Sequence, residues 1–437
     1  MVHNFGCRAS QADGAAIEAG LAGEGLASVS SYAAADWVVF NTCTVTSNAD
    51  DDLRQAVRRV QRENPEARIL VTGCYAQRAP EEIAALPGVS MVVGNSHKTR
   101  IPELIRPRLV QLGPVSTTSY HGEIHVGDIF AQQDFLAAPV EDASGDRARP
   151  NLKIQDGCGN RCSFCIIPSV RGRSRSMPLV EVLAQMRALS AEYPEVVLSG
   201  INLGRWGRES AYDSGRGPMR LAGLVRLLLN ETPVARLRLS SVEPMDLTTE
   251  LLELMASNDR IARHVHAPLQ SGSDTVLRRM HRKYRPRHYE DRIRLAHLLM
   301  PDAAIGADVM TGFPGETDAE FEASYRFIES LPFTYLHVFT YSERPGTAAA
   351  THPNPVPVPI RKDRNRRLRE LAGSKHRVFR ESMVGRRLSA VTLDGGSRAL
   401  SSNYLQIELH QARAAREIVE AHITGLTSSG LAADLIS

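Results

Sequence analysis

The sequence predicts an α/β protein with an N-terminal parallel α/β (Rossmann-like) domain, a central partial (β/α) TIM-like barrel and a small C-terminal all-β module. Short β-branched runs alternate with helical stretches in the first two blocks, and this alternation is typical of parallel sheets. Towards the C-terminus the pattern changes to short alternating runs, which favour strands. We place the domains at 1–108, 148–377 and 378–437, with a linker at 109–147 that is rich in Gly, Ser, Thr and Gln.

The N-terminal block alternates strands and helices. We expect strands at residues 37–40, 69–71 and 91–93, with helices at 13–21 and 50–63 between them. Only five residues precede the first Gly-Cys pair, so we expect the first strand to be almost absent. The carboxyl ends of parallel strands share one edge of the sheet, and that edge is where ligands bind in such folds.

The central block repeats the same alternation six times, with helices such as 179–191 and 318–331 between the strands. In partial (β/α) barrels the functional residues lie at the carboxyl ends of the strands. The expected strands are 152–154, 196–198, 237–239, 264–266, 304–309 and 335–339.

Three cysteines lie within eight residues, directly after the first strand of the central block. Cys158, Cys162 and Cys165 form a C-x3-C-x2-C run, with the aromatic Phe164 before the last cysteine. A 4Fe-4S cluster has four irons that each take a thiolate, so three ligands leave one iron open for chemistry. A zinc site is the alternative, but zinc sites usually pair two C-x2-C knuckles and have four ligands. The run therefore favours a cluster with an open iron.

The other three cysteines are Cys7, Cys43 and Cys74. Cys7 lies near the start of the chain, and the other two directly follow predicted strands of the N-terminal sheet, so we expect all three thiols at one sheet edge. There they could hold a second 4Fe-4S cluster, again with an open iron. A disulfide framework is compatible with six cysteines, but such frameworks are typical of short secreted chains, and we expect no signal peptide here.

Length and composition indicate an enzyme rather than a membrane protein. The chain has 437 residues, of which 43% are hydrophobic, and its net charge is only +3. No apolar stretch approaches the ~18 residues that span a bilayer, so we expect no membrane association and a cytoplasmic location.

The whole chain resembles the methylthiotransferases, which belong to the radical S-adenosylmethionine (SAM) enzymes and carry a C-terminal TRAM module. The similarity covers residues 4 to 375 and rests on motifs in the family's order. These are Gly6-Cys7-Arg8, Asn41 to Thr46, Val71 to Tyr75, the Cys158 run continuing to Pro168, Arg171 to Ser176, Leu239 to Pro244, Ala267 to Ser273, Gly312 to Glu316 and Tyr341 to Gly346. Two positions depart from the family: Ser10 stands where it usually has Asn, and Asp13 where it often has Glu. The C-terminal module matches weakly.

The resemblance implies two 4Fe-4S clusters and SAM as cofactors. Cys158, Cys162 and Cys165 would be the catalytic cluster ligands, where an electron cleaves SAM to a 5'-deoxyadenosyl radical. Cys7, Cys43 and Cys74 would hold the auxiliary cluster, which carries the sulfur. No side chain by itself supplies the radical that an inert C–H bond requires, so a cofactor must supply it. The expected SAM contacts are Phe164, Gly200, Asn202, Glu243 and Gln270.

The substrate expectation rests on Asn41-Thr-Cys-Thr-Val-Thr46, which is most like the branch that modifies N6-threonylcarbamoyladenosine at position 37 of tRNA. Alternatives are the branches acting on isopentenyladenosine 37 or on a ribosomal protein, and a non-catalytic iron–sulfur or RNA-binding protein. The expected partners are tRNA and a low-potential electron donor of flavodoxin or ferredoxin type; the sulfur donor is not identified. We expect Arg171, Arg173 and Arg175, next to the cluster loop, to bind RNA, because guanidiniums bind phosphates bidentately.

Overall fold

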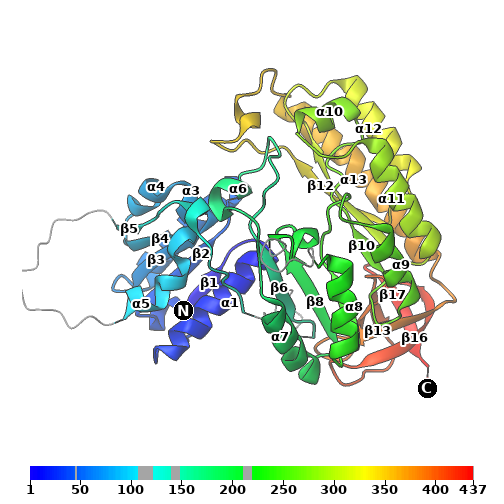
Figure 1. The fold of residues 1–437 in the computed structure, drawn as a ribbon, viewed down its shortest axis with the longest axis horizontal. Coiled ribbons are helices and arrows are strands. Elements are labelled where there is room, and N and C mark those ends of the chain that lie inside the picture. Colours follow the sequence, from blue (N-terminus) through cyan, green and yellow to red (C-terminus); the bar gives the residue numbers. More distant parts are fainter. Residues whose placement is uncertain (45–46, 107–121, 139–147, 210–218, 437) are drawn as a thin grey trace, which may run out of the picture.

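The computed structural model describes residues 1–437 except 45–46, 107–121, 139–147, 210–218 and 437. Three units follow one another along the chain, and Figure 1 shows the N-terminal unit in blue, the central unit in green to orange and the C-terminal unit in red. None of the described helices combines the length and apolarity that crossing a bilayer requires.

The N-terminal unit is a five-stranded parallel sheet in the order β1-β2-β3-β4-β5. Alternate residues of each strand face opposite sides, so the apolar runs need helices on both faces. Phe40 packs with α2 (Ser47–Glu63), α3 (Cys74–Arg78) and α4 (Pro80–Ala84), whereas Val39 packs with α1 (Arg8–Gly23) and α5 (Ile101–Ile105). The strands are β1 (Val2–Asn4), β2 (Trp37–Thr42), β3 (Arg68–Gly73), β4 (Val89–Gly94) and β5 (Glu123–His125).

The expected elements of this unit are present, and two further strands join its sheet. The first strand, expected to be almost absent, forms over Val2–Asn4 and pairs with β2. β5 (Glu123–His125) lies inside the segment 109–147 that we expected to be a linker, and it extends the sheet beside β4. Most of that segment, 109–121 and 139–147, lies outside the described residues.

The central unit is a partial barrel of six parallel strands, and all six expected strands are confirmed. It is built from a sheet β7-β6-β8-β9 and a sheet β10-β11-β12, joined by a bridge between Leu237 and Ile261. The short β7 (Arg175–Ser176) runs antiparallel to β6 at the edge. The parallel strands are β6 (Asn151–Asp156), β8 (Glu195–Gly200), β9 (Arg236–Leu239), β10 (His264–His266), β11 (Ala304–Thr311) and β12 (Tyr335–Thr340).

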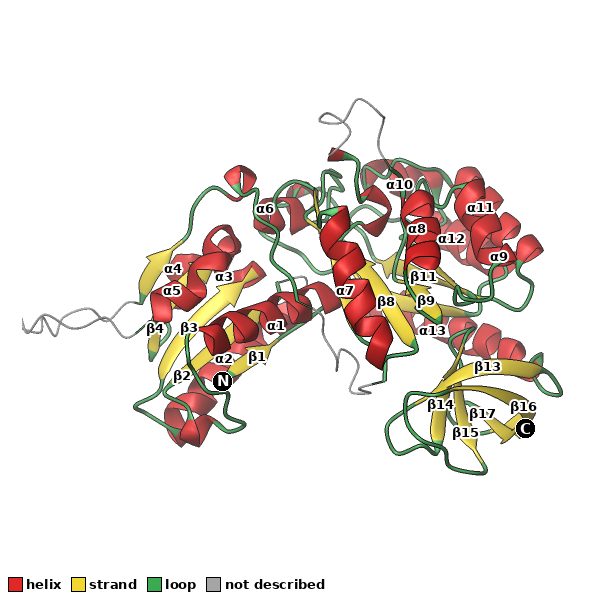
Figure 2. Cartoon of the chain, turned by 60° about the horizontal axis from the view of Figure 1, so that its bottom comes forward, coloured by secondary structure: helices red, strands yellow, loops and turns green. Residues whose placement is uncertain are grey.

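Helices cover the outer face of the barrel and bury one continuous apolar core. Figure 2 shows α7 and α8 beside β8, and α11 and α12 on the far side of the barrel. The apolar residues of these helices recur at helical spacing, which is why each presents a single face to the sheet. The helices are α7 (Leu179–Glu192), α8 (Leu221–Glu231), α9 (Thr249–Ser257), α10 (Asp274–Arg279), α11 (Pro286–Leu299), α12 (Asp318–Ser330) and α13 (Val358–Glu381).

The C-terminal unit is a small closed barrel in the order β13-β14-β15-β17-β16, consistent with the expected TRAM-like module. It follows the long helix α13 and packs against the beginnings of the central strands, where Arg238 of β9 donates to the carbonyls of Ser401 and Ser402 at 3.1 Å. Its strands are β13 (Arg387–Thr392), β14 (Arg398–Ser401), β15 (Gln406–Leu409), β16 (Ile418–Leu426) and β17 (Leu431–Leu435).

Candidate functional site

The loop after β6 brings Cys158, Cys162 and Cys165 to the carboxyl end of the barrel. Gly157 enters the loop with φ +69°, and a Cβ there would lie 2.0 Å from the carbonyl oxygen of Arg173. The chain can therefore turn this sharply only with glycine. The amide of Cys158 donates to Gly172 O at 3.1 Å, and that of Cys165 to Cys162 O at 3.1 Å. These bonds hold the three cysteines in one compact loop.

Polar groups surround two of these thiols. Arg282 Nη1 lies 3.2 Å from Cys162 Sγ, and its Nη2 lies 2.5 Å from Glu243 Oε2. Asn202 Nδ2 lies 3.6 Å from Cys158 Sγ. Burial raises the pKa of Cys162, against the opposing effect of Arg282, and burial raises the pKa of Cys165 to about 12.

This environment fits an iron–sulfur cluster. Thiols with raised pKa values hold their protons until a metal displaces them, and metal binding then releases those protons. The N–H donors of Arg282 and Asn202 are placed to stabilise sulfur once it is negative. None of the six cysteines, all of which lie in the described part of the chain, forms a disulfide, which gives no support to a disulfide framework.

The expected SAM contacts lie around this loop. Asn202 is buried, and its backbone N–H donates to Gln155 Oε1 at 2.6 Å. Gly200 lies so close to Gln155 that a Cβ at Gly200 would be 2.9 Å from the Gln155 side chain. Glu243 is engaged by Arg282. A cavity of about 290 Å³ lies beside the loop, and Phe164 and Gln270 are among its lining residues. The five residues thus border one region, and their contact with SAM remains a prediction.

The N-terminal trio lies at the carboxyl edge of its sheet. Cys43 follows β2, and Cys74 follows β3, whose last residue Gly73 pairs with Thr42. Cys7 follows β1 through Gly6, where φ is +98° and a Cβ would lie 2.9 Å from Cys43 Sγ. Cys43 and Cys74 are buried, whereas Cys7 is exposed. Three thiols on three neighbouring strand ends suit a second metal cluster, and this ligand set also remains a prediction.

The two cysteine groups adjoin each other across the contact between the domains. Cys74 packs against Ile166, which follows Cys165 directly along the chain, and against Val170 in the helix after it. Asn95 Nδ2 lies 3.7 Å from Cys74 Sγ and donates to Val170 O at 2.7 Å. The N-terminal trio therefore lies beside the segment that follows the Cys158–Cys165 loop.

A buried ionic network joins the two domains beside these sites. Arg171 Nη1 contacts Asp156 at 2.9 Å and Nη2 contacts Asp13 of α1 at 3.0 Å. Lys98 contacts Asp13 at 2.9 Å, and Lys153 contacts both aspartates. Burial opposes ionisation of Asp13, but Lys153, Lys98 and Arg171 outweigh it and lower the pKa of Asp13 to about 2.

The position of Arg171 contradicts the expectation that it binds RNA. Its side chain is 2% exposed and its guanidinium is committed to two carboxylates, because the docking of α1 covers it. Arg175 is half-buried, and its Nη1 donates to the carbonyl of Arg171 at 3.1 Å. Arg173 is exposed, so it alone of the three presents its side chain to solvent.

Several polar residues at these sites were not singled out from the sequence. Arg282 lies in a run of basic residues, but nothing in that run distinguishes the side chain that turns towards Cys162. Lys98 and Lys153 were also not singled out, although the chain has only five lysines. The available signal for Lys153 is that a charged residue within a buried strand such as β6 needs a buried partner, which is Asp13.

Comparisons with known proteins agree with this arrangement. Residues 1–94 match the model of Uncharacterized protein family UPF0004, and residues 152–328 match that of the Radical SAM superfamily. The Threonylcarbamoyladenosine tRNA methylthiotransferase MtaB of Aquifex aeolicus is 35% identical over 92% of this chain and 95% of its own length. The Bacillus subtilis protein of the same name is 41% identical over 76% and 71%. The tRNA-2-methylthio-N(6)-dimethylallyladenosine synthase of Novosphingobium aromaticivorans is 33% identical over 88% and 84%.

Among solved structures, the radical SAM methyltransferase TsrM from Kitasatospora setae aligns with a TM-score of 0.54 at 17% identity, over 77% of this chain and 66% of that chain. This likeness concerns the fold alone. The fold and the three-cysteine loop define a radical SAM enzyme, whose chemistry uses a 4Fe-4S cluster and SAM. The chain belongs to the methylthiotransferase family of these enzymes.

Proposed function

We propose that this enzyme adds a methylthio group to C2 of N6-threonylcarbamoyladenosine at position 37 of tRNA. The observation that carries the proposal is the juxtaposition of two cysteine trios, because sulfur transfer to a carbon radical needs a radical source and a sulfur source at one site. Cys74, of the N-terminal trio, packs directly against Ile166 of the catalytic loop.

In this proposal each cysteine trio holds one 4Fe-4S cluster. When bound, the catalytic cluster and SAM supply a 5'-deoxyadenosyl radical that removes the hydrogen from C2. Arg282 holds Cys162 and Glu243 in place, while Asn202 donates towards Cys158. Phe164 and Gln270 border the cavity into which the adenine and SAM would fit, and Cys165 lies on the same wall.

The choice of substrate is supported by the relatives and by the motif around Cys43. Five similar proteins carry the threonylcarbamoyladenosine name, at 32% to 41% identity. Relatives named for dimethylallyladenosine reach 33% to 35%, so overall identity alone separates the branches weakly. The Asn41 to Thr46 motif favours the threonylcarbamoyl branch; its last two residues lie outside the described ones.

The remaining partners belong to the same proposal. A low-potential flavodoxin or ferredoxin would reduce the catalytic cluster, and the substrate tRNA implies a cytoplasmic location. Arg173 is the member of the arginine run that we retain as an RNA contact, because it is exposed beside the catalytic loop.

Nucleoside analysis of tRNA tests the proposal. A strain lacking this protein should accumulate threonylcarbamoyladenosine and lose its methylthio derivative, and the intact gene should restore it. The Cys158→Ala variant serves as the matched control and should fail to restore it. If the strain instead lost the methylthio derivative of isopentenyladenosine, the enzyme would belong to the branch that acts on isopentenyladenosine 37. Its reaction would still be methylthiolation.

A further inference from the structure

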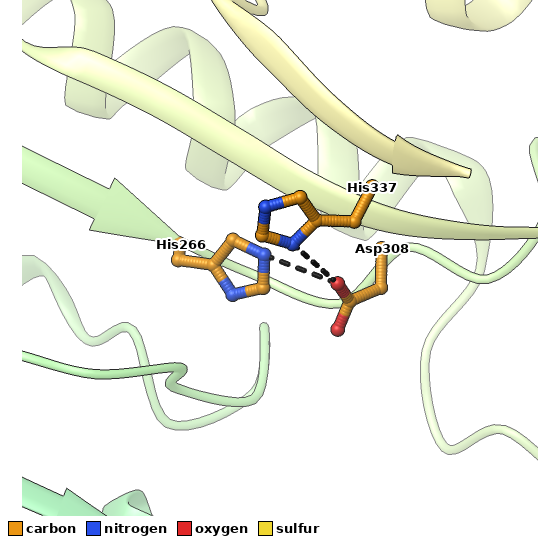
Figure 3. A group of neighbouring side chains, drawn as sticks. All are labelled: His266, Asp308 and His337. Carbon is orange, nitrogen blue, oxygen red and sulfur yellow. Dashed lines mark hydrogen bonds and ion pairs between the residues drawn. The ribbon is translucent and has the colours of Figure 1, made fainter. Parts of the chain in front are cut away.

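Three side chains outside the cysteine sites converge inside the partial barrel, as Figure 3 shows: His266 of β10, Asp308 of β11 and His337 of β12. The strands are neighbours, and Asp308 pairs in register with His337. Asp308 Oδ1 lies 3.3 Å from His266 Nε2 and 3.2 Å from His337 Nδ1. All three ligand atoms lie within 4.8 Å of one another.

The two separations from Asp308 Oδ1 match those between ligands of one metal ion. Ligands at roughly 2.0–2.2 Å from an ion, at tetrahedral or octahedral angles, lie about 3.0–3.5 Å apart. Two imidazoles with one carboxylate are the ligand set of many mononuclear iron and zinc sites, and that set leaves coordination positions open.

The orientation of His266 turns its Nε2 towards Asp308. Ser241 Oγ shares a hydrogen bond of 2.7 Å with His266 Nδ1, so Nε2 is the nitrogen that faces Asp308. His266 is 7% exposed, and among the described residues its Nε2 has no hydrogen-bond partner, because the 3.3 Å contact lacks hydrogen-bond geometry. Metal-binding histidines usually donate their other ring N–H to an acceptor that fixes the orientation of the ring, and Ser241 Oγ is placed to be that acceptor.

The other side of the group opens towards the catalytic loop. The His337 side chain is 53% exposed and that of Asp308 24% exposed. Asp308 also lines the cavity of about 290 Å³ that Cys165 and Phe164 border. An ion held here would therefore keep its open positions on the side of that cavity.

We propose that His266, Asp308 and His337 bind one divalent cation of the Mn²⁺, Fe²⁺ or Zn²⁺ class, with open coordination positions facing the cavity beside Cys165. This site is distinct from both cysteine trios, and its ligands are nitrogen and oxygen rather than sulfur. Its open positions would accept water or an oxygen atom of a substrate.

Mn²⁺ binding tests the site without relying on activity, because this ion prefers nitrogen and oxygen ligands to thiolates. Reconstituted protein with oxidised clusters would be desalted with EDTA and titrated with MnCl₂ in the absence of tRNA. Binding is measured as loss of the EPR signal of free Mn²⁺, and coordinated imidazole as nitrogen modulation of the spin echo. The control is His410→Gln, which removes an exposed histidine–aspartate pair on the C-terminal module, 2.8 Å apart.

We expect one Mn²⁺ per chain with imidazole nitrogen modulation, and at least about tenfold weaker binding in His337→Gln and Asp308→Asn. His410→Gln should bind like the wild type. His337 is half-exposed on its strand, so its replacement spares the core even if Asp308→Asn folds poorly. The proposal is wrong if the wild type retains no Mn²⁺, or if His337→Gln binds it with unchanged affinity and unchanged nitrogen modulation.

Discussion

Arg171, in the catalytic domain, forms a buried ion pair with Asp13 of the N-terminal domain, with Nη2 and Oδ2 3.0 Å apart. The two residues are 158 positions apart in the chain, and both side chains are 2% exposed. The same guanidinium binds Asp156, which ends the strand leading into the cysteine loop. This arginine therefore ties the auxiliary site to the catalytic loop rather than contacting solvent.

The first prediction separates this structural role from RNA binding. Arg171→Gln should destabilise the protein by about 3–5 kcal/mol, because it leaves two buried carboxylates with fewer cations. It should leave the salt dependence of tRNA binding unchanged. Replacement of the exposed Arg173 by Gln should leave the stability of the protein unchanged. It should make the slope of log affinity for tRNA against log salt concentration flatter by roughly one counterion. Thermal unfolding and tRNA titrations at several salt concentrations measure both. If the salt dependence of tRNA binding became flatter in Arg171→Gln, Arg171 would be an RNA contact after all.

The second prediction concerns the independence of the two cysteine trios. Anaerobically reconstituted protein, desalted with EDTA, should carry about eight irons per chain, and the Cys158/Cys162/Cys165→Ala variant about four. Cys43→Ala should still cleave SAM to 5'-deoxyadenosine but lose methylthiolation, because only the catalytic trio is needed for cleavage. Iron analysis measures the cluster content of the triple variant. Chromatography of 5'-deoxyadenosine and of the modified nucleoside measures the two activities of Cys43→Ala. Complete loss of iron from the triple variant would show that the N-terminal trio is not a site of its own.

The third prediction concerns Arg282, whose guanidinium lies 3.2 Å from Cys162 Sγ. A hydrogen bond to a cluster sulfur stabilises the reduced, more negative state, so Arg282→Gln should lower the reduction potential of the catalytic cluster. SAM cleavage should fall by roughly 10- to 100-fold, as for other residues that support metal ligands. An EPR-monitored redox titration gives the potential. The exposed Arg278→Gln, from the same basic run, is the control and should match the wild type in both measurements.

The strands and helices were predictable wherever burial leaves a periodic pattern. The apolar residues of the six central strands belong to one buried core, because helices cover the outer face of these strands and their other face lines the barrel interior. β5 was not predicted, because Glu123 and Ile124 are exposed and the strand is only three residues long. β5 forms because the rest of the sheet offers β4 as a pairing partner, and the local sequence of β5 contains no signal for this pairing.

The cysteines of the candidate site were predictable, because three thiols at close spacing have few structural roles. Their electrostatic surroundings were not. An arginine near a cluster loop can bind either a phosphate or a buried carboxylate, and the choice depends on which surface docks over it. Asp13 reaches Arg171 only because α1 packs on the edge of the barrel. In the same way, His266 and His337 are 71 residues apart and meet only through the order of the strands.

The last prediction concerns Glu195 of β8, which is buried where the barrel meets the C-terminal module. Burial opposes its ionisation, but Arg238, which contacts it at 2.6 Å, and the neighbouring Arg149 and Arg236 lower the pKa of Glu195 to about 2. Its usual value is about 4.5, so the ionised side chain contributes stability above pH 4.5 and loses that contribution as the pH falls towards 2.

The shift is worth about 3 kcal/mol at neutral pH. Glu195→Gln should therefore lower the stability of the apoprotein at pH 7 by about 3–5 kcal/mol, since it leaves buried arginines without their carboxylate. The difference between variant and wild type should shrink between pH 4.5 and 2. Thermal unfolding across this range measures it, with the exposed Glu231→Gln as the control. A difference that stays constant down to pH 2 would mean that packing, and not charge, makes Glu195 important for holding the module on the barrel.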